Sequence, residues 1–316
     1  MHQLRRLDPG LDRDQGLTLA VPTTEKPPPA RTGRGSLLAR SSGLRTGLLL
    51  LPPMLWLGVA YLAALGALFI TSLWGQDDFT GQILRVWSLD NYRDLVNVPV
   101  YRTIAFRTIG IAALVTVVDA VLAFPIALFM AKVASPRVRR LLVIAVLMPL
   151  WASYLVKAYA WRGMFSEGGL IDWAGKPFGL HSPGYGLVAT TITLAYLWLP
   201  YMILPIFAGL ERVPNSLFEA SGDLGAGALT TIRRVVLPMA FPAVVAGSIF
   251  TFSLSLGDYI AVQIVGGAGQ LLGNVVYANV GSANNLPFAS ALATVPVVVM
   301  LVYLAAARRT GALENL

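Results

Sequence analysis

The chain has 316 residues, of which 56% are hydrophobic and only 13% are charged. Soluble domains are about 45–50% apolar and about 25% charged, so this composition excludes an ordinary soluble enzyme. The net charge of +8 comes from a terminal tail and from short runs between apolar segments, which does not indicate a nucleic-acid partner.

Residues 1–45 are polar and rich in Arg, Pro and Gly, and no apolar periodicity runs through them. Such a composition cannot bury enough apolar surface to order a chain, so we predict a disordered tail. The segment is not a signal peptide, because no short apolar core and cleavage site follow a brief basic start.

The remainder, residues 46–316, contains six apolar stretches. A transmembrane helix needs about 20 consecutive apolar residues at a rise of about 1.5 Å each, and each stretch is long enough. The fourth lies in an uncharged run that begins at residue 177. The predicted spans are 46–75, 108–131, 141–161, the segment that ends near 210, 236–257 and 287–307. The fold class is therefore all-α, a polytopic membrane protein with six transmembrane helices.

The distribution of Lys and Arg predicts the orientation in the membrane. With the N-terminus inside, the inner segments hold 17 of the 24 basic residues and the outer segments hold 7. The short turn at 132–140 carries four of them. We therefore expect both termini to be cytoplasmic.

Several kinds of chemistry are absent from the sequence. It contains no P-loop, no G-x-S-x-G, no H-E-x-x-H and no Cys, and it has two His. We therefore expect no enzyme activity, no metal site and no cofactor on this chain. If it transports a solute, the energy comes from an ion gradient or from an ATPase on another subunit.

The connection between the fourth and fifth spans, residues 211–238, has the pattern of a helical elbow. Ser216 and Glu219 have the spacing of a capping box, which predicts the start of a short helix. Gly225 is suited to end it, and Pro238 stands at the entry to the next span. Such an elbow has an apolar face that the chain itself buries poorly, which favours docking on a partner. The residues of this face are Leu217, Phe218, Ala220, Leu224 and Leu229.

This connection resembles the EAA motif of the inner-membrane permeases of binding-protein-dependent ABC transporters. The family pattern is E-A-A, three residues, Gly, nine residues, I-x-L-P. The matching residues are Glu219-Ala220-Ser221, Gly225 and Val235-Val236-Leu237-Pro238. The chain departs from the pattern at Ser221, which replaces Ala, and at Val235, which replaces Ile. The resemblance covers residues 103–307.

The resemblance implies a coupling helix that sits in a groove on an ATPase subunit and moves with it. It also implies partners: two ABC ATPase subunits, a second permease of different but homologous sequence, a substrate-binding protein and membrane lipid. The residues to which it assigns coupling are Glu219, Ala220, Ser221, Asp223, Gly225, Leu237 and Pro238. The simpler alternative is that Glu219 only caps its own helix and Gly225 only ends it.

Within this family the chain is similar to the spermidine/putrescine-type permeases. Thiamine- and ferric-iron-type permeases share much of the same pattern, and Lys157 replaces the Arg that related members commonly have. The residues that carry the similarity are Pro149-Leu-Trp151, Tyr154-Leu-Val-Lys157-Ala-Tyr159-Ala-Trp161, Leu256-Gly-Asp258-Tyr259 and Val265-Gly-Gly-Ala-Gly-Gln270-Leu-Leu-Gly-Asn274. The implied cargo is a small organic cation such as a polyamine, with thiamine, ferric iron or another small solute as the alternative.

Two carboxylates inside predicted spans are candidates for the substrate pathway. Ionisable side chains in a membrane are costly and usually face a polar cavity or a partner. Asp119 lies near the middle of the second span and Asp258 at the end of the fifth. Aromatic faces would add cation–π attraction of about 0.5–2 kcal/mol. The aromatic candidates are Trp151, Tyr159, Trp161 and Tyr259. Alternatively, these rings mark the membrane interfaces, and Asp119 pairs with a partner permease.

Three other functions compete with an ABC permease. An ion-coupled secondary transporter would use Asp119 as the carrier, but the chain shows no internal repeat and six helices are few for that design. A membrane enzyme would need a polar catalytic cluster, and a channel subunit would not need the elbow. The 211–238 segment favours the permease over all three.

The orientation can be tested by labelling, because the wild-type chain contains no Cys. We expect Ser135→Cys to be protected from an impermeant thiol reagent in intact cells, and Gly169→Cys to be labelled. Both should react after permeabilisation. The reverse pattern in intact cells would show that the orientation is wrong.

Overall fold

The computed structural model describes residues 42–77 and 79–310. The chain divides into two units, residues 1–59 and residues 60–316, and each is described by itself. In the first unit, the described residues form the beginning of helix α1 (Ser42–Ser72), which contains Pro52 and Pro53. The predicted tail otherwise lies outside the described residues.

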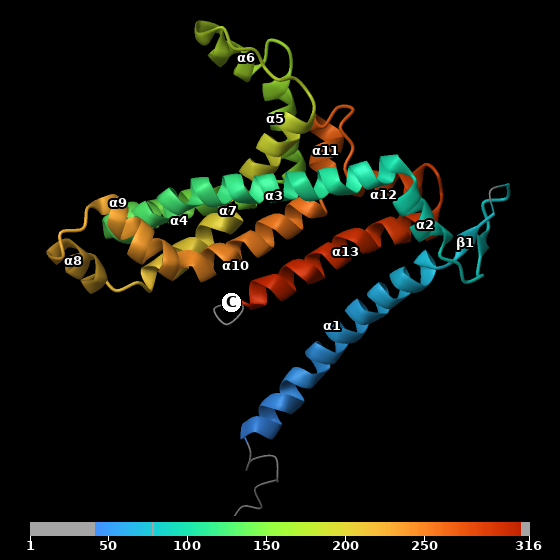
Figure 1. Cartoon of the computed structure of the whole chain (residues 1–316), viewed down its shortest axis with the longest axis horizontal. Helices are drawn as coiled ribbons and strands as arrows, with labels where there is room; N and C mark the ends of the chain where they lie inside the picture. Colours follow the sequence, from blue (N-terminus) through green and yellow to red (C-terminus); the bar gives the residue numbers. More distant parts are fainter. Residues whose placement is uncertain (1–41, 78, 311–316) are drawn as a thin grey trace, which may run out of the picture. The chain divides into compact units, whose positions relative to one another are not determined.

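The second unit is built almost entirely of helices (Figure 1). Its long helices are α3 (Pro99–Leu128), α4 (Pro136–Trp151), α5 (Tyr154–Phe165), α7 (Leu187–Glu211), α10 (Leu237–Leu256) and α13 (Leu286–Arg308). The shorter ones are α2 (Asp90–Asn97), α6 (Leu170–Gly175), the 3-10 turn η3 (Lys176–Phe178), α8 (Ser216–Asp223), α9 (Ala228–Thr231), α11 (Ile260–Val265) and α12 (Leu272–Gly281). Two π-helical turns, η2 (Phe129–Val133) and η4 (Ile232–Val236), adjoin α3 and α10. The strands β1 (Gly75–Gln76) and β2 (Ile83–Leu84) pair antiparallel, with Gly75 opposite Leu84.

The all-α, multi-pass architecture predicted from the sequence is confirmed. Among the described residues, five helices are long and apolar enough to cross a membrane, and the bent pair α4–α5 is a sixth candidate.

The third predicted span, 141–161, is wrong as a single helix. α4 and α5 meet at an angle of 93°, and Ala152 between them has an extended backbone (ψ 140°). The Lys157 ammonium donates to the carbonyl of Pro149 at 3.1 Å, which satisfies a carbonyl freed by the break. Both halves are apolar, so hydropathy does not reveal the break.

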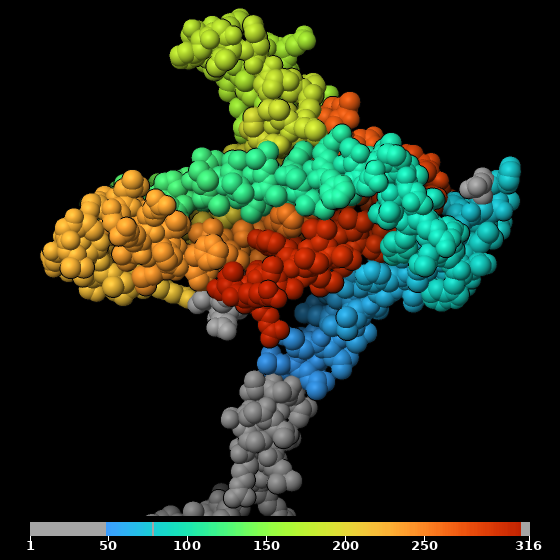
Figure 2. Space-filling model, in the orientation of Figure 1, coloured from blue at the N-terminus to red at the C-terminus, as the bar shows by residue number. Residues whose placement is uncertain are grey.

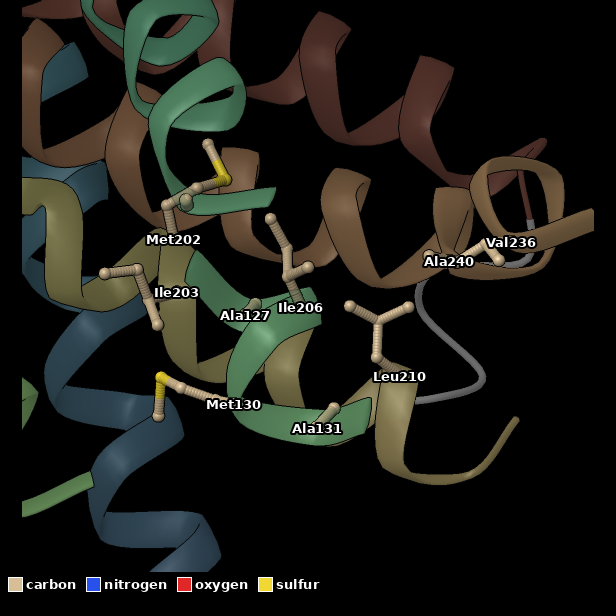
Figure 3. Packing of buried hydrophobic residues seen from close by; sticks show 10 residues of the cluster. Ala127, Met130, Ala131, Met202, Ile203, Ile206, Leu210, Val236 and Ala240 are labelled. Carbon is tan, nitrogen blue, oxygen red and sulfur yellow. The ribbon is translucent and has the colours of Figure 1, made fainter. Parts of the chain in front are cut away.

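The core of the second unit lies where α3, α7 and α10 pack against one another (Figure 1). Buried residues recur along α3 every three to four positions, which makes one continuous face. Figure 3 shows the part of the core near the end of α3, where small and flexible side chains from all three helices meet. Its buried members are Ala123, Ala127, Met130, Ala131, Met202, Ile203, Ile206, Leu210, Val236 and Ala240.

Two glycines bring α7 and α10 close together. A Cβ at Gly209 would collide with the Cβ of Ala243, and a Cβ at Gly247 would lie 2.9 Å from the sulfur of Met202. Small residues allow such close approach, which is a main source of helix association in membranes because lipid supplies no hydrophobic drive. The α7–α10 contact therefore depends on these glycines.

One labelling position can be improved from the structure. A Cβ at Gly169 would lie 2.6 Å from the carbonyl oxygen of Gly163. The neighbouring Glu167 is exposed, so Glu167→Cys is the better probe of that loop.

We expect Gly209→Ala to destabilise the protein although Ala favours helix by about 1 kcal/mol over Gly. The facing atom is an Ala Cβ that cannot rotate away, and overpacking of this kind costs about 1–3 kcal/mol. Gly110→Ala is the matched control, because Gly110 lies in α3 with open space around its Cβ position. Thermal unfolding in detergent should show a lower Tm for Gly209→Ala and an unchanged or higher Tm for Gly110→Ala. Equal Tm values would contradict the close α7–α10 contact.

Candidate functional site

The elbow between α7 and α10 consists of α8, a glycine turn and α9. α8 begins at Ser216, so Ser216 is the first helical residue and not the N-cap that the predicted capping box requires. Asn215 takes the N-cap position with a helical backbone, and its carbonyl accepts from Phe218 N at 2.9 Å. Ser216 is therefore already inside the helix, and its hydroxyl is not placed to receive the amide three residues on. The capping-box prediction is wrong, although the helix begins where it was expected.

The end of α8 is a Schellman motif. Gly225 has φ 75°, the left-handed conformation that Gly adopts without steric cost. Ala226 N donates to Ser221 O at 3.0 Å and Gly225 N donates to Gly222 O at 2.8 Å. These bonds place Gly225 at the position directly after the C-cap of α8.

The second arm of the elbow runs into the membrane helix. α9, η4 and α10 follow one another without an intervening loop, from Ala228 to Leu256. Leu237 and Pro238 are the first two residues of α10. Pro238 has no N–H to continue the regular helical pattern, and the turn immediately before α10 is π-helical.

The surface of the elbow is a mixture of motif residues and apolar side chains. Figure 2 shows α8 and α9, in amber and orange, at the surface at one end of the helices of the second unit. Leu224 is 87% exposed and Leu229 is 79% exposed. Six of the seven motif residues are also exposed, namely Glu219, Ala220, Asp223, Gly225, Leu237 and Pro238. An exposed apolar pair flanked by two carboxylates is a surface suited to a partner protein.

Ser221 is the motif residue that turns inward. Its hydroxyl lies 2.7 Å from the hydroxyl of Thr231 on α9, and both residues are buried. This bond joins the two arms of the elbow across the glycine turn.

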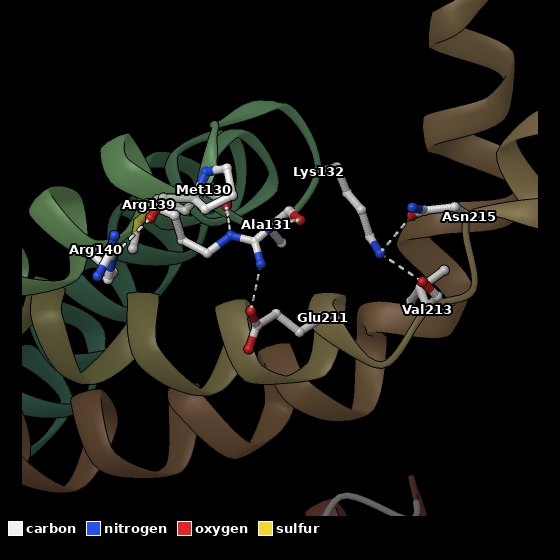
Figure 4. A network of polar contacts seen from close by, with 9 residues as sticks. Met130, Ala131, Lys132, Arg139, Arg140, Glu211, Val213 and Asn215 are labelled. Carbon is white, nitrogen blue, oxygen red and sulfur yellow. Dashed lines mark hydrogen bonds and ion pairs between the residues drawn. The ribbon is translucent and has the colours of Figure 1, made fainter. Parts of the chain in front are cut away.

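Lys132 connects the end of α3 to the beginning of the elbow (Figure 4). Its ammonium donates to the carbonyl of Val213 at 2.6 Å and to Asn215 Oδ1 at 3.3 Å, and it lies 5.6 Å from the centre of the Phe218 ring. A cation held by two oxygens and an aromatic face fixes the position of the chain that enters α8.

Arg139 at the start of α4 caps the end of α3 (Figure 4). Its guanidinium donates to the carbonyls of Met130 at 3.0 Å and Ala131 at 2.9 Å, and it pairs with Glu211 at 3.1 Å. Because both charged partners are partly exposed, the ion pair itself contributes little. The main effect is to supply donors to carbonyls at the end of a helix.

A groove of about 530 Å³ runs between the elbow and the end of α3. Its walls are mostly apolar, with one ammonium and one carboxylate. The lining residues are Leu128, Lys132, Val133, Asn215, Phe218, Glu219, Gly222, Ala226, Ala228, Thr231 and Ile232.

Asp258 occupies the break between α10 and α11. The hydroxyl of Tyr154, on α5, donates to its Oδ2, and Ala261 N donates to Oδ1 at 2.9 Å. The carboxylate is buried and therefore joins α5 to the first turn of α11. Nearby, the guanidinium of Arg162 donates to the carbonyl of Ile264 at the end of α11 at 2.5 Å.

The other predicted pathway residues have different neighbours. Asp119 is fully buried in α3, and its oxygens accept no hydrogen bond from the described residues. Trp151 is 92% exposed, and Tyr159 is also exposed. The ring of Trp161 stacks on Phe165 at 5.5 Å, and that of Tyr259 stacks on Tyr277 at 5.1 Å. In this conformation these contacts do not join the six candidates to one another.

Four residues of these sites were not among the sequence-based candidates: Lys132, Arg139, Tyr154 and Thr231. Lys132 and Arg139 could have been suspected only because they lie in the basic turn after the second span. Nothing in the spacing could pair Tyr154 with Asp258, because 104 positions separate them.

The sequence matches known membrane proteins along most of its length. Residues 123–309 match a family model described as binding-protein-dependent transport system inner membrane component. The inner membrane ABC transporter permease protein YdcU of Escherichia coli (strain K12) is 41% identical over 306 residues, covering 91% of this chain and 97% of that protein. The spermidine/putrescine transport system permease protein PotB of Haemophilus influenzae is 30% identical over 233 residues, covering 72% and 81%.

Solved structures share the fold. A chain from the crystal structure of a bacterial alginate ABC transporter, in complex with an alginate pentasaccharide-bound periplasmic protein, superposes with a TM-score of 0.66 at 14% identity, covering 88% of this chain and 96% of that one. A chain of the MetNI methionine ABC transporter superposes with a TM-score of 0.52 at 19% identity, covering 68% and 95%. At these identities the likeness concerns the fold alone.

Proposed function

The chain belongs to the binding-protein-dependent transport system inner membrane components, and on this basis we propose that it forms the pathway of an ABC importer for a small organic cation. As a permease subunit of an ABC transporter, it is a multi-pass inner membrane protein. The observation that carries the proposal is the elbow. It presents the family motif on an exposed surface and leads without a break into α10.

In the proposed mechanism, the exposed face of α8 and α9 docks on a separate ABC ATPase subunit. Leu224 and Leu229 supply apolar area for this contact, while Glu219 and Asp223 supply charge. Two ATPase subunits, a second homologous permease and a substrate-binding protein complete the importer. The elbow then lies on the cytoplasmic side, together with both termini. ATP-driven closure of the ATPases displaces α8, and α10 moves with it.

The proposed cargo is a polyamine of the spermidine/putrescine type. The 30% identity to PotB of H. influenzae supports this class, as do the sequence features around 149–161 and 256–274. A multivalent cation leaves water at a high cost unless carboxylates or aromatic faces receive it. Asp119 and Asp258 are the buried carboxylates among the described residues. The hydroxyl of Tyr154 donates to Asp258, and Tyr259 is the next residue in the chain.

We expect Glu219→Ala and Gly225→Pro to leave the chain in the membrane but to weaken ATPase docking. Pro at 225 removes the donor to Gly222 O and cannot adopt a positive φ. Gly227→Ala is the matched control, because Gly227 has φ −70° and open space around it. Co-purification of the ATPase and ATP-driven uptake should both fall in the first two variants and be retained in the control. Normal uptake in both would refute the docking role.

We expect Asp258→Asn to reduce uptake by about tenfold or more, because it removes the charge while preserving the shape and the acceptor for Ala261 N. Tyr154→Phe is the matched control: it removes the hydroxyl that binds Asp258 but keeps the carboxylate. Both variants should assemble with the ATPase, and the control should retain more uptake. If both lose assembly and uptake together, Asp258 is only structural.

The cargo class can be tested with the complex of permeases, ATPase and binding protein reconstituted in vesicles. Its ATPase activity should be stimulated by polyamine-loaded binding protein and not by thiamine or ferric iron. Stimulation by ferric iron alone would overturn both the polyamine assignment and the cation-binding role of Asp258.

A further inference from the structure

We propose that α8 is a rigid bridge, tied at its start to α3 by Lys132 and at its end to α9 and α10 by the Ser221–Thr231 hydroxyl pair, so that its displacement moves both membrane helices together. The inference rests on the proposed coupling function and adds positioning residues to it. Neither tie follows from the family motif, since the motif has Ala where this chain has Ser221 and Lys132 lies outside the motif.

The first tie joins the beginning of the bridge to α3. Lys132 lies in η2, directly after α3, and its ammonium donates to Val213 O and Asn215 Oδ1. These two acceptors precede α8 by only one to three residues. Because the ammonium also faces the Phe218 ring in the first turn of α8, the contact reaches into the helix itself.

The second tie joins the end of the bridge to α10. Ser221 lies in the last turn of α8, and Thr231 is the last residue of α9. Their hydroxyls are 2.7 Å apart in a buried position, where water competes little for the bond. The Schellman motif holds the same end of α8 through backbone bonds, so the angle between the two arms is fixed twice.

Both ties lead into continuous helices. α3 runs from Pro99 through the η2 turn to Val133, and the α9–α10 segment runs from Ala228 to Leu256. These two helices also pack against each other and against α7. A displacement of α8 is therefore passed to the core at two points, and the angle between α8 and α9 does not change.

A Cys pair tests the second tie directly, because the wild-type chain contains no Cys. Ser221→Cys with Thr231→Cys places two thiols where the hydroxyls meet, within reach of a disulfide. In the reconstituted complex with binding protein and ATPase, the oxidised pair should transport as much substrate per ATP as wild type. The reduced pair should transport roughly threefold to tenfold less per ATP, since a thiol pair is a poor hydrogen-bonding substitute.

The outcomes separate a rigid bridge from a flexing elbow. Uptake that is blocked by the disulfide while the ATPase stays bound would show that the α8–α9 angle must change, which overturns the proposal. Failure of the disulfide to form would contradict the close approach of the two side chains. Ser221→Cys with Thr230→Cys is the control pair and should not cross-link, and the wild-type complex controls for cysteines of the partners.

Lys132→Met tests the first tie, and Arg140→Met is its matched control. Arg140 bonds only to Pro136 O within its own helix at 3.3 Å, among the contacts of the described residues. Lys132→Met should keep ATPase docking but consume roughly threefold to tenfold more ATP per substrate, and Lys132→Arg should recover much of the loss. If assembled complexes with Lys132→Met and with Arg140→Met consume the same amount of ATP per substrate, the tie through Lys132 is refuted and the tie through Ser221 and Thr231 is not affected. A wild-type complex without any ATPase would instead refute the proposed function.

Discussion

The structure depends on how the carbonyl groups at the ends and breaks of apolar helices find donors. Inside the bilayer core no water reaches such groups, and at the membrane surface a side-chain donor fixes their position. Here long basic side chains supply the donors: Lys132 to Val213, Arg139 to Met130 and Ala131, Lys157 to Pro149 and Arg162 to Ile264. Several basic residues that mark loops by composition are thus structural caps that make interrupted helices possible.

Both candidate functional sites lie at these interruptions of the helices. A set of uninterrupted helices would present only apolar surface to lipid. The break after α7 produces the exposed elbow, and the breaks around α5 and α11 bring Tyr154 to Asp258. The elbow in turn is held by a hydroxyl pair, by an ammonium and by the Phe218 ring, which packs against the core. Short polar ties of this kind have a defined geometry, which the proposed transmission of movement through α8 requires.

The sequence predicted the features that local composition determines and missed those that arise from contacts between distant segments. Apolar length located the spans, and the conformational freedom of Gly225 located the end of α8. The bend between α4 and α5 was missed because both halves are equally apolar. The capping box was misassigned because Asn215, and not Ser216, occupies the N-cap position. Asp258 was expected to face a pathway, but its bonds to Tyr154 and Ala261 cross from one broken helix to another, which no local pattern encodes. Its role toward substrate stays a prediction.

The proposed function requires that an ATPase on another chain drives transport by moving this elbow. It is tested most directly by purifying the chain with its native partners, identifying them by mass and reconstituting the complex in vesicles. We expect an ABC ATPase and a second permease chain in the complex, with uptake that requires ATP and persists when proton and sodium gradients are collapsed. A complex that lacks an ATPase and takes up substrate only when an ion gradient is imposed would contradict it.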